Sequence, residues 1–416
     1  MIEAEMEAER NTTALPPAST ITRLPELLAA LPTSVRTRAE QLLAVERVQG
    51  YAVVPPAMQE WVTDHFGGVE RVTEQTILKV TNLATLEAAS FNPLRSRRPR
   101  EVDAASSALS DETLDEMIAA STGARSMFSD PTNQTTADRF GRIQGKHCVS
   151  ASNIAKYDAW HGLVIFNEPH PLRFTRAQLG DYFDVALRWL VAAHQTDPHA
   201  RYPLITWNCL WKGGASITHG HLQMVLSRGM AWGHQERQRR ASVAYRARHH
   251  RSLSDDLWHL HEHLGLAFPT PPEIRGYATL TPIKDRDLVL MSGRIAELEQ
   301  QSTMGSPLPN LDTSALQACL APLWDAAYLA LRSLIDDQGV RSFNLVAALP
   351  PFGPTAEPWD DWSCLVRMVD RGDPLSRLVN FGAMELFASS VITTDPFAVA
   401  TALRETIPRF LPHPTP

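Results

Sequence analysis

The chain has 416 residues, of which 44% are hydrophobic and 20% charged, which are the proportions of an ordinary globular protein rather than of a disordered or collagen-like one. Its 39 Lys and Arg residues against 46 Asp and Glu residues give a net charge of −7, which argues against sequence-independent binding to nucleic acid or anionic membranes. The length allows two or three domains or one large duplicated unit.

The first 75 residues are predicted to be a tail followed by a helical extension. Residues 1–20 are polar and carry prolines, which is typical of a loose tail. Two mixed helical patterns follow, near 25–48 and 57–66. The acidic start MIEAEMEAER lacks the basic and then apolar pattern of a secretory signal, so no targeting segment is expected.

A basic stretch follows a short strand predicted at 76–80. This stretch, FNPLRSRRPR, includes Arg95, Arg97 and Arg98. A solvated basic loop is the usual interpretation of such a run, and a local anion site is the alternative.

Regular elements begin after residue 153. HGLVIF at 161–166 predicts a buried strand, and Thr175 with Gln178 three residues later gives the capping-box signature of a helix start. A strand at 203–211, the glycine-bearing loop WKGGAS and a strand at 219–227 are predicted next. We therefore assign residues 76–235 to a first half of the protein.

A second set of elements follows in the same order. Residues 236–263 indicate exposed helix, YATLTPI and LVLM predict strands, residues 316–335 predict an amphipathic helix, and SFNLVAAL predicts a further strand. No clear internal sequence repeat accompanies this order. We nevertheless expect two similar α+β halves, the second spanning 236–416.

The strand predicted at 219–227 carries the most specific pattern. Its two-residue period places His219, His221 and Gln223 on one face. Two imidazoles and an amide on a buried strand face need partners, because each unsatisfied polar group costs about 1 to 3 kcal/mol. A bound ligand would supply those partners.

The loop before this strand indicates phosphate chemistry. Gly213 and Gly214 would let backbone N–H groups approach an anion, and Ser216 adds a hydroxyl donor. An imidazole can attack an α-phosphorus to give a covalent nucleotidyl-histidine when an acceptor holds its other nitrogen. His221 is the candidate nucleophile, and the neutral amide of Gln223 can donate a hydrogen bond to a phosphoryl oxygen.

The segment NCLWKGGASITHGHLQM resembles the active-site segment of galactose-1-phosphate uridylyltransferases, a branch of the histidine-triad superfamily. The matching positions around His221 are Asn208, Gly214, Ser216, His219 and Gln223. The resemblance implies a fold of two fused histidine-triad-like halves, each an antiparallel sheet with packed helices. It also implies that only the first half is catalytic, with His221 as nucleophile and Gln223 and Ser216 as phosphate ligands.

Two weaker similarities extend the candidate site. NIAKYDAWHGLVIFNEPHPLRFT resembles the superfamily's nucleoside-pocket segment, which implies a substrate-binding role for Asn153 and maps His170 to a family histidine. FNPLRSRRP resembles a family stretch with phosphate-binding arginines, which implies that role for Arg95, Arg97 and Arg98.

Departures from the family pattern remove its metal sites. Many members hold zinc with a C-x-x-C pair and two histidines that His170 and His219 would match, but the four cysteines here include no such pair. In the second half, Ala347 and Leu349 stand where imidazoles of a further metal site would be. We expect neither a metal nor another cofactor. Val391, in place of a polar glutamine, argues against galactose 1-phosphate as the acceptor.

The resulting expectation is a cytoplasmic nucleotidyltransferase. It would move a nucleoside monophosphate from a nucleoside-diphosphate sugar to a sugar 1-phosphate or to inorganic phosphate. A diadenosine-polyphosphate phosphorylase or hydrolase is one alternative, and a nucleotide-binding protein without turnover is another. Family enzymes often share active sites across a dimer, which leaves a homodimer open, and neither nucleic acid nor a membrane is expected as a partner.

Overall fold

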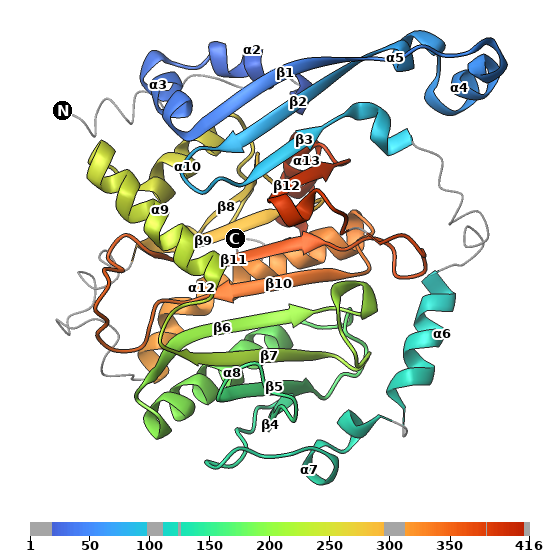
Figure 1. The fold of residues 1–416 in the computed structure, drawn as a ribbon. Coiled ribbons are helices and arrows are strands. Elements are labelled where there is room, and N and C mark those ends of the chain that lie inside the picture. The colour runs from blue at the N-terminus through green and yellow to red at the C-terminus, as the bar shows by residue number, and fades with distance from the viewer. Residues whose placement is uncertain (1–18, 98–110, 124–125, 295–312, 380, 412–416) are drawn as a thin grey trace, which may run out of the picture.

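The computed structural model describes residues 19–97, 111–123, 126–294, 313–379 and 381–411. Its larger sheet has eight antiparallel strands in the order β4-β5-β7-β6-β10-β11-β9-β8 (Figure 1). The strands are β4 (Cys148–Ser152), β5 (Trp160–Phe166), β6 (Ala200–Asn208), β7 (His221–Arg228), β8 (Arg275–Ala278), β9 (Leu288–Arg294), β10 (Phe343–Ala348) and β11 (Ser363–Asp370).

Each half of this sheet has the same connectivity. In the first half, β5 leads through helix α8 (Arg176–Thr196) to β6 and then to β7, which lies between β5 and β6. In the second half, β9 leads through helix α12 (Thr313–Arg332) to β10 and then to β11, which lies between β9 and β10. The predicted pair of α+β halves is confirmed. The two halves share one continuous sheet, however, because β6 pairs directly with β10.

Helices α8 and α12 cover one face of the large sheet (Figure 1). The predicted capping box begins α8, where Thr175 Oγ1 accepts from the Gln178 N–H and Gln178 Oε1 accepts from the Thr175 N–H. The rings of Phe183 and Trp324 stack between the two helices, with centroids 4.1 Å apart. This covered face contains much of the hydrophobic core, so the opposite face is free to carry polar side chains.

A glycine brings α8 close to the sheet. A Cβ atom on Gly162 of β5 would lie 2.5 Å from the ring of Trp189, so only glycine fits there without a shift. Because side chains alternate along β5, the neighbouring His161 lies on the opposite, uncovered face.

A smaller sheet has the strand order β1-β2-β3-β12, with β12 parallel to β3. Its strands are β1 (Leu43–Tyr51), β2 (Glu74–Asn82), β3 (Ala88–Phe91) and β12 (Ser389–Ile392). Four helices adjoin its hairpin in the sequence: α2 (Leu24–Ala29), α3 (Thr33–Leu42), α4 (Gln59–Phe66) and α5 (Val69–Thr73).

The prediction for the N-terminal region was wrong in one respect. The helix expected over 25–48 ends at Leu42, and the next nine residues form β1. Pairing with β2 along the whole length of β1 decides this conformation. The expected boundary at residue 75 consequently falls inside β2, and the extension contributes a hairpin as well as helices.

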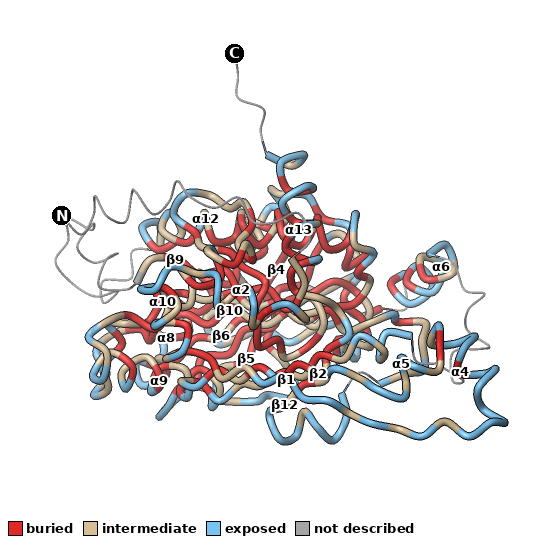
Figure 2. Tube along the Cα trace, turned by 90° about the horizontal axis from the view of Figure 1, so that it is seen from above, coloured by how far each residue is buried: buried red, intermediate tan, exposed pale blue. Residues whose placement is uncertain are grey.

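The remaining helices are α6 (Asp111–Thr122), α7 (Pro131–Gln134), α9 (Gly233–His249), α10 (Leu253–His263) and α13 (Pro396–Thr406). Figure 2 shows the buried residues concentrated in the body of the molecule, while the far part of the β1–β2 hairpin is exposed. Within the described residues, one helical segment, Thr313–Asp337, is long and apolar enough to cross a membrane. Of its most apolar window, 61% is buried inside the protein, as in a core helix.

Candidate functional site

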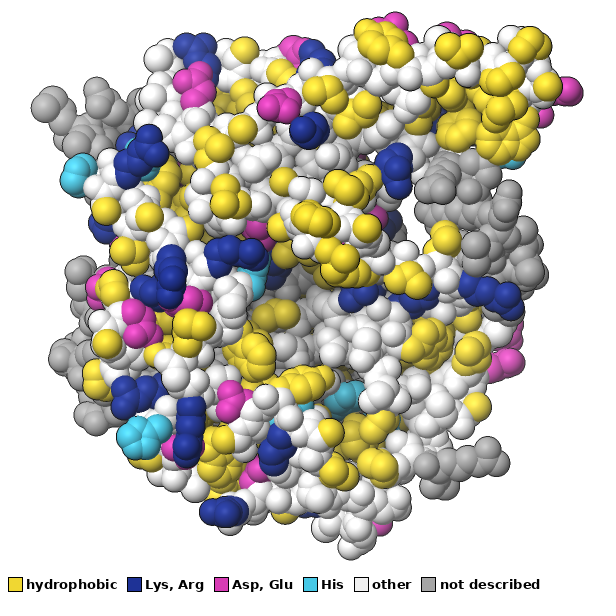
Figure 3. Space-filling view, viewed as in Figure 1, with side chains coloured by type: hydrophobic (Ala, Val, Ile, Leu, Met, Phe, Trp, Pro, Cys, Tyr) yellow, Lys and Arg dark blue, Asp and Glu magenta, His cyan; other side chains and the backbone are white. Residues whose placement is uncertain are grey.

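Strand β7 positions the central histidine. Its Leu222, Met224 and Leu226 are fully buried, and the alternate residues His221 and Gln223 lie on the face opposite α8. Figure 3 shows that this side of the molecule is hollowed near its centre, with basic and histidine side chains around the hollow. The predicted convergence of His221 and Gln223 on one strand face is therefore present.

Hydrogen bonding fixes the tautomer of His221. Its Nδ1 lies 2.8 Å from the backbone oxygen of His219, an atom that can only accept, so Nδ1 carries the hydrogen. The lone pair is then on Nε2, and no residue in the described part of the chain forms a hydrogen bond with that atom. Burial lowers the pKa of His221 and outweighs the bond to His219, so the ring is neutral near pH 7.

His219 lies just before the strand, because β7 begins at His221 rather than at residue 219 as predicted. The backbone next to His219 is held by the loop after β5, because the Gly220 N–H donates to the oxygen of Pro169. The Nε2 of His219 bonds to the oxygen of Phe166 at 2.8 Å, and its buried Nδ1 has no partner among the described residues.

A phenylalanine that the sequence pattern did not identify packs against both imidazoles. Phe128 presents its ring edge-on to His219 and His221, with centroids 5.9 and 5.3 Å away. It belongs to a small apolar cluster with Leu163 and Ile165 of β5. These contacts exclude water from one side of the histidine pair.

Gln223 contacts a third imidazole, which was also missed. The Oε1 of Gln223 lies 3.0 Å from Nε2 of His161, whose side chain is completely buried on the neighbouring strand β5. Asn153, predicted to bind substrate, lies on the other side of His161, with its Nδ2 at 3.2 Å from the same nitrogen. Asn153 and Gln223 are thus brought together by His161. The sequence pattern had assigned His161 to a buried strand but not to the site.

The backbone N–H groups of the glycine loop are not arranged to bind an anion as predicted. Gly214 has a left-handed backbone with φ of 93°, and a Cβ on Gly213 would lie 2.7 Å from the backbone oxygen of Phe343. The N–H groups of Gly214 and Ala215 donate to backbone oxygens within the loop, so in this conformation they are not free to bind an anion. Ser216 is exposed and forms no hydrogen bond within the described chain, which leaves its hydroxyl as the available donor.

The second half of the protein contributes directly to this loop. Asn344 on β10 donates from Nδ2 to Oδ1 of Asn208 at 2.7 Å and to the oxygen of Gly213 at 2.6 Å. Its Oδ1 accepts from Arg371 at 2.5 Å. Asn208, predicted to bind substrate, is therefore a partner of the second half. Asn344 could not be found from the sequence because it reaches the loop through the pairing of β6 with β10, and Arg371 joins only through Asn344.

The predicted phosphate-binding arginines lie elsewhere. Arg95 lines a large hollow of about 930 Å³ together with Lys284, Arg371 and Val391, and the lining of this hollow includes neither His219 nor His221. Arg97 is exposed and donates to the backbone oxygen of Phe66. Arg98 lies outside the described residues. The structure does not bring Arg95 or Arg97 into contact with the histidine pair.

The family's zinc position has a different arrangement here. Nε2 of His170 lies 3.0 Å from Oδ1 of Asp115, and that carboxylate also pairs with Arg173 at 2.7 Å. Among the described residues, no group of three or more His, Cys, Asp or Glu side chains is arranged to hold a metal ion. His170 thus has a carboxylate partner rather than a set of metal ligands.

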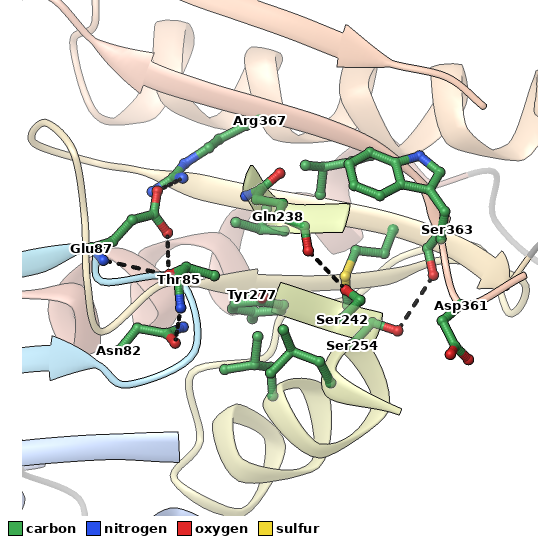
Figure 4. Close-up of a pocket in the computed structure, with 16 residues that line it drawn as sticks. Asn82, Thr85, Glu87, Gln238, Ser242, Ser254, Tyr277, Asp361, Ser363 and Arg367 are labelled. Atoms are coloured by element: carbon green, nitrogen blue, oxygen red, sulfur yellow. Dashed lines mark hydrogen bonds and ion pairs between the residues drawn. The ribbon is translucent and has the colours of Figure 1, made fainter. Parts of the chain in front are cut away.

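Strand β11, the counterpart of β7 in the second half, carries no histidine. Strands β7 and β11 are both eight residues long, and counting from their first residues matches His221 with Ser363 and Gln223 with Leu365. Figure 4 shows Ser363 and Tyr277 at a cavity of about 90 Å³ on this part of the sheet. On this strand of the second half, a serine and a leucine therefore stand where β7 has His221 and Gln223.

Comparisons with known proteins give the fold. No family model and no curated protein matches the chain. Among solved structures, an ADP-glucose phosphorylase from Arabidopsis thaliana with bound ADP-glucose matches with a TM-score of 0.55 and 12% identity over 78% of this chain and 97% of that one. A uridylyltransferase matches with a TM-score of 0.52 and 14% identity over 67% and 90%. A GalT-like protein from Arabidopsis thaliana matches with a TM-score of 0.50 and 12% identity over 66% and 89%. The chain therefore has the fold of these three proteins, which agrees with the fold that the sequence resemblance implied.

Proposed function

We propose that the protein is a nucleotidyltransferase of the phosphorylase or uridylyltransferase type that acts through a covalent nucleotidyl-His221. The observation that carries this proposal is the tautomer of His221. Because Nδ1 donates to the backbone oxygen of His219, Nε2 carries the lone pair; it has no hydrogen-bond partner among the described residues and lies on the strand face that also carries Gln223. A neutral imidazole with one nitrogen anchored and the other free is the arrangement that nucleophilic catalysis requires.

The reaction proceeds in two displacements. Nε2 of His221 attacks the α-phosphorus of the donor, a P–N bond forms, and the bond from phosphorus to the leaving phosphate oxygen breaks. An oxygen of a phosphorylated acceptor then attacks the same phosphorus, and the P–N bond breaks to restore the neutral imidazole. The amide of Gln223 and the hydroxyl of Ser216 donate to the phosphoryl oxygens, where negative charge increases in each transition state.

The donor is proposed to be a nucleoside-diphosphate sugar. The structural relatives include an ADP-glucose phosphorylase with bound ADP-glucose and a uridylyltransferase, which together support this donor class. We propose inorganic phosphate or a sugar 1-phosphate as the acceptor. Val391 stands where the sequence resemblance leads one to expect a polar glutamine, which argues against dedicated recognition of galactose 1-phosphate.

A substrate screen tests the proposed function. Purified protein is incubated with ADP-glucose, UDP-glucose, UDP-galactose and diadenosine tetraphosphate, with and without inorganic phosphate or sugar 1-phosphates, and products are separated by chromatography. We expect acceptor-dependent cleavage of a nucleoside-diphosphate sugar and its loss in His221→Asn. Preferential cleavage of the dinucleotide would instead identify a diadenosine-polyphosphate phosphorylase or hydrolase. Binding of nucleotide without cleavage of any donor would identify a binding protein.

We further propose that the active protein is a cytoplasmic homodimer. Exposed apolar side chains gather in the loop before β12, where Val379, Leu386 and Phe387 are 77%, 71% and 81% exposed. A second copy that covers this loop would remove the apolar surface from water. Analytical ultracentrifugation tests this proposal, since Phe387→Glu should shift a dimer toward the monomer, and a wild-type monomer at all concentrations contradicts it.

A further inference from the structure

The buried His161 on β5 is a polar residue of the site that takes no part in the two displacements. Its side chain has no solvent exposure, and it lies opposite Val225, one diagonal step from Gln223 on β7. The ring of Tyr157 stacks on it, with centroids 4.3 Å apart. Because a buried imidazole is costly without partners, its hydrogen bonds decide its role.

The tautomer of His161 follows from the backbone. The N–H of Tyr157 donates to Nδ1 of His161 at 3.0 Å, and a backbone N–H has no lone pair to offer in return. Nδ1 is therefore the acceptor, and the neutral ring carries its hydrogen on Nε2. This is the opposite tautomer to that of His221, where the backbone oxygen of His219 places the hydrogen on Nδ1.

The hydrogen on Nε2 of His161 has one acceptor within the described residues. Oε1 of Gln223 lies 3.0 Å from it. Asn153 cannot be a second acceptor. Its Oδ1 accepts from the Ala155 N–H, and the atom that it places near His161 is Nδ2, which is a donor. Gln223 thus accepts through Oε1, and its orientation is set by the tautomer of His161.

This hydrogen bond determines what Gln223 presents to a ligand. The oxygen and nitrogen of an amide diverge from one trigonal carbon, so an Oε1 bound to His161 leaves the Nε2 hydrogens directed elsewhere. No residue in the described part of the chain forms a hydrogen bond with Nε2 of Gln223. A flipped amide would instead present an oxygen, which repels a phosphoryl oxygen.

We propose that His161 is a positioning residue that holds the Gln223 amide with its N–H groups toward the phosphoryl group, an inference that rests on the proposed function. Lys156 brings a positive charge close to His161, because its Nζ donates to the backbone oxygen of His161 at 3.1 Å. Burial lowers the pKa of His161 and Lys156 lowers it further, although the bond to Gln223 opposes both. The ring therefore stays neutral, and protonation of Nδ1 would displace the Tyr157 N–H.

Two amide substitutions separate positioning from packing. His161→Gln can place an N–H donor near the position of Nε2, whereas His161→Asn can place an acceptor near the position of Nδ1 and leaves no donor toward Gln223. With the donor found by the substrate screen, we expect His161→Asn to reduce kcat by about 10- to 100-fold, and His161→Gln to stay within about fivefold of the wild type. Gln223→Leu combined with His161→Asn should cost little more than Gln223→Leu alone. Equal losses in the two His161 variants, or a smaller loss in His161→Asn, would overturn the proposal.

Nitrogen-15 NMR of the imidazoles gives a readout that needs no turnover. The wild type should show His161 protonated at Nε2, and Gln223→Leu should shift that N–H proton because its acceptor is gone. Buried His261, whose Nε2 accepts from the Leu280 N–H, is the matched control and should not shift. His161 protonated at Nδ1, or an unchanged Nε2 signal in Gln223→Leu, refutes the hydrogen bond. If the wild type cleaves no donor, the proposed function fails, and this NMR result still decides whether His161 orients the amide.

Discussion

Replacing Asn344 with leucine tests whether the second half supports the glycine loop. Asn344→Leu keeps a similar side-chain volume and removes the two donations from Nδ2, to Asn208 Oδ1 at 2.7 Å and to the Gly213 oxygen at 2.6 Å. It also removes the Oδ1 atom that accepts from the Arg371 guanidinium. The loop should then lose these hydrogen bonds to β10 while the hydrophobic core remains intact.

The magnitude follows from the burial of the atoms that lose partners. Each hydrogen bond contributes about 1 kcal/mol net, and a buried acceptor left without a donor adds about 1 to 3 kcal/mol. Gly213 is buried, whereas Asn208 and Asn344 are half-buried, so water can replace part of the loss at the asparagines. We therefore expect the free energy of unfolding to fall by about 2 to 3 kcal/mol.

Urea unfolding followed by tryptophan fluorescence measures this change, with all variants at one protein concentration. Asn133→Leu is the matched control, because the amide of Asn133 is exposed and bonds only to the nearby carboxylate of Asp130 among the described residues. It should change the stability by less than about 0.5 kcal/mol. If Asn344→Leu is as stable as this control, Asn344 does not hold the loop and the reasoning fails.

Three further predictions concern packing, pH and product choice. Gly162→Ala should destabilise the protein by about 1 to 3 kcal/mol, because its Cβ would lie 2.5 Å from the Trp189 ring, and a thermal melt equal to the wild type would refute that contact. Burial lowers the pKa of His261 from 6.5 to about 4. As the pH falls, the unfolded chain therefore protonates at His261 before the folded protein does. The stability that this group contributes above pH 6.5 is lost as the pH falls toward 4. His261 alone should lower the free energy of unfolding by about 2 kcal/mol near pH 5. In calorimetry, His261→Gln should therefore lose less stability than the wild type between pH 7 and pH 5, and an identical loss counts against the assignment. Gln223→His should raise the share of free nucleoside monophosphate at saturating acceptor, because an imidazole can assist water where an amide cannot, and unchanged product ratios on chromatography would contradict this role.

The parts of the fold that depend on local signals were predictable. The capping box of Thr175 and Gln178 and the apolar run of β5 depend on residues close in sequence, and both elements formed as predicted. Strand β1 was missed because residues 43–51 become extended only when β2 pairs with them. Such pairing depends on partners about 30 residues away, which periodicity alone does not reveal.

The candidate site was likewise predictable where it depends on residues close together in the sequence. Strand alternation placed His221 and Gln223 on one face, because both belong to β7. His161 and Asn344 were missed, since each reaches the site through the register of a neighbouring strand. The glycine loop was only partly anticipated, because the sequence does not tell which amides bond within the loop and which face outward.

The most direct test of the account is the mass of the protein after brief incubation with its sugar-nucleotide donor in the absence of acceptor. Intact-protein mass spectrometry should show the addition of one nucleoside monophosphate, labile to acid and stable to base, with peptide mapping to His221. Added acceptor should discharge it, and His221→Asn should not form it. Rapid donor cleavage by wild-type protein without this adduct, or an adduct on another residue, would contradict the account.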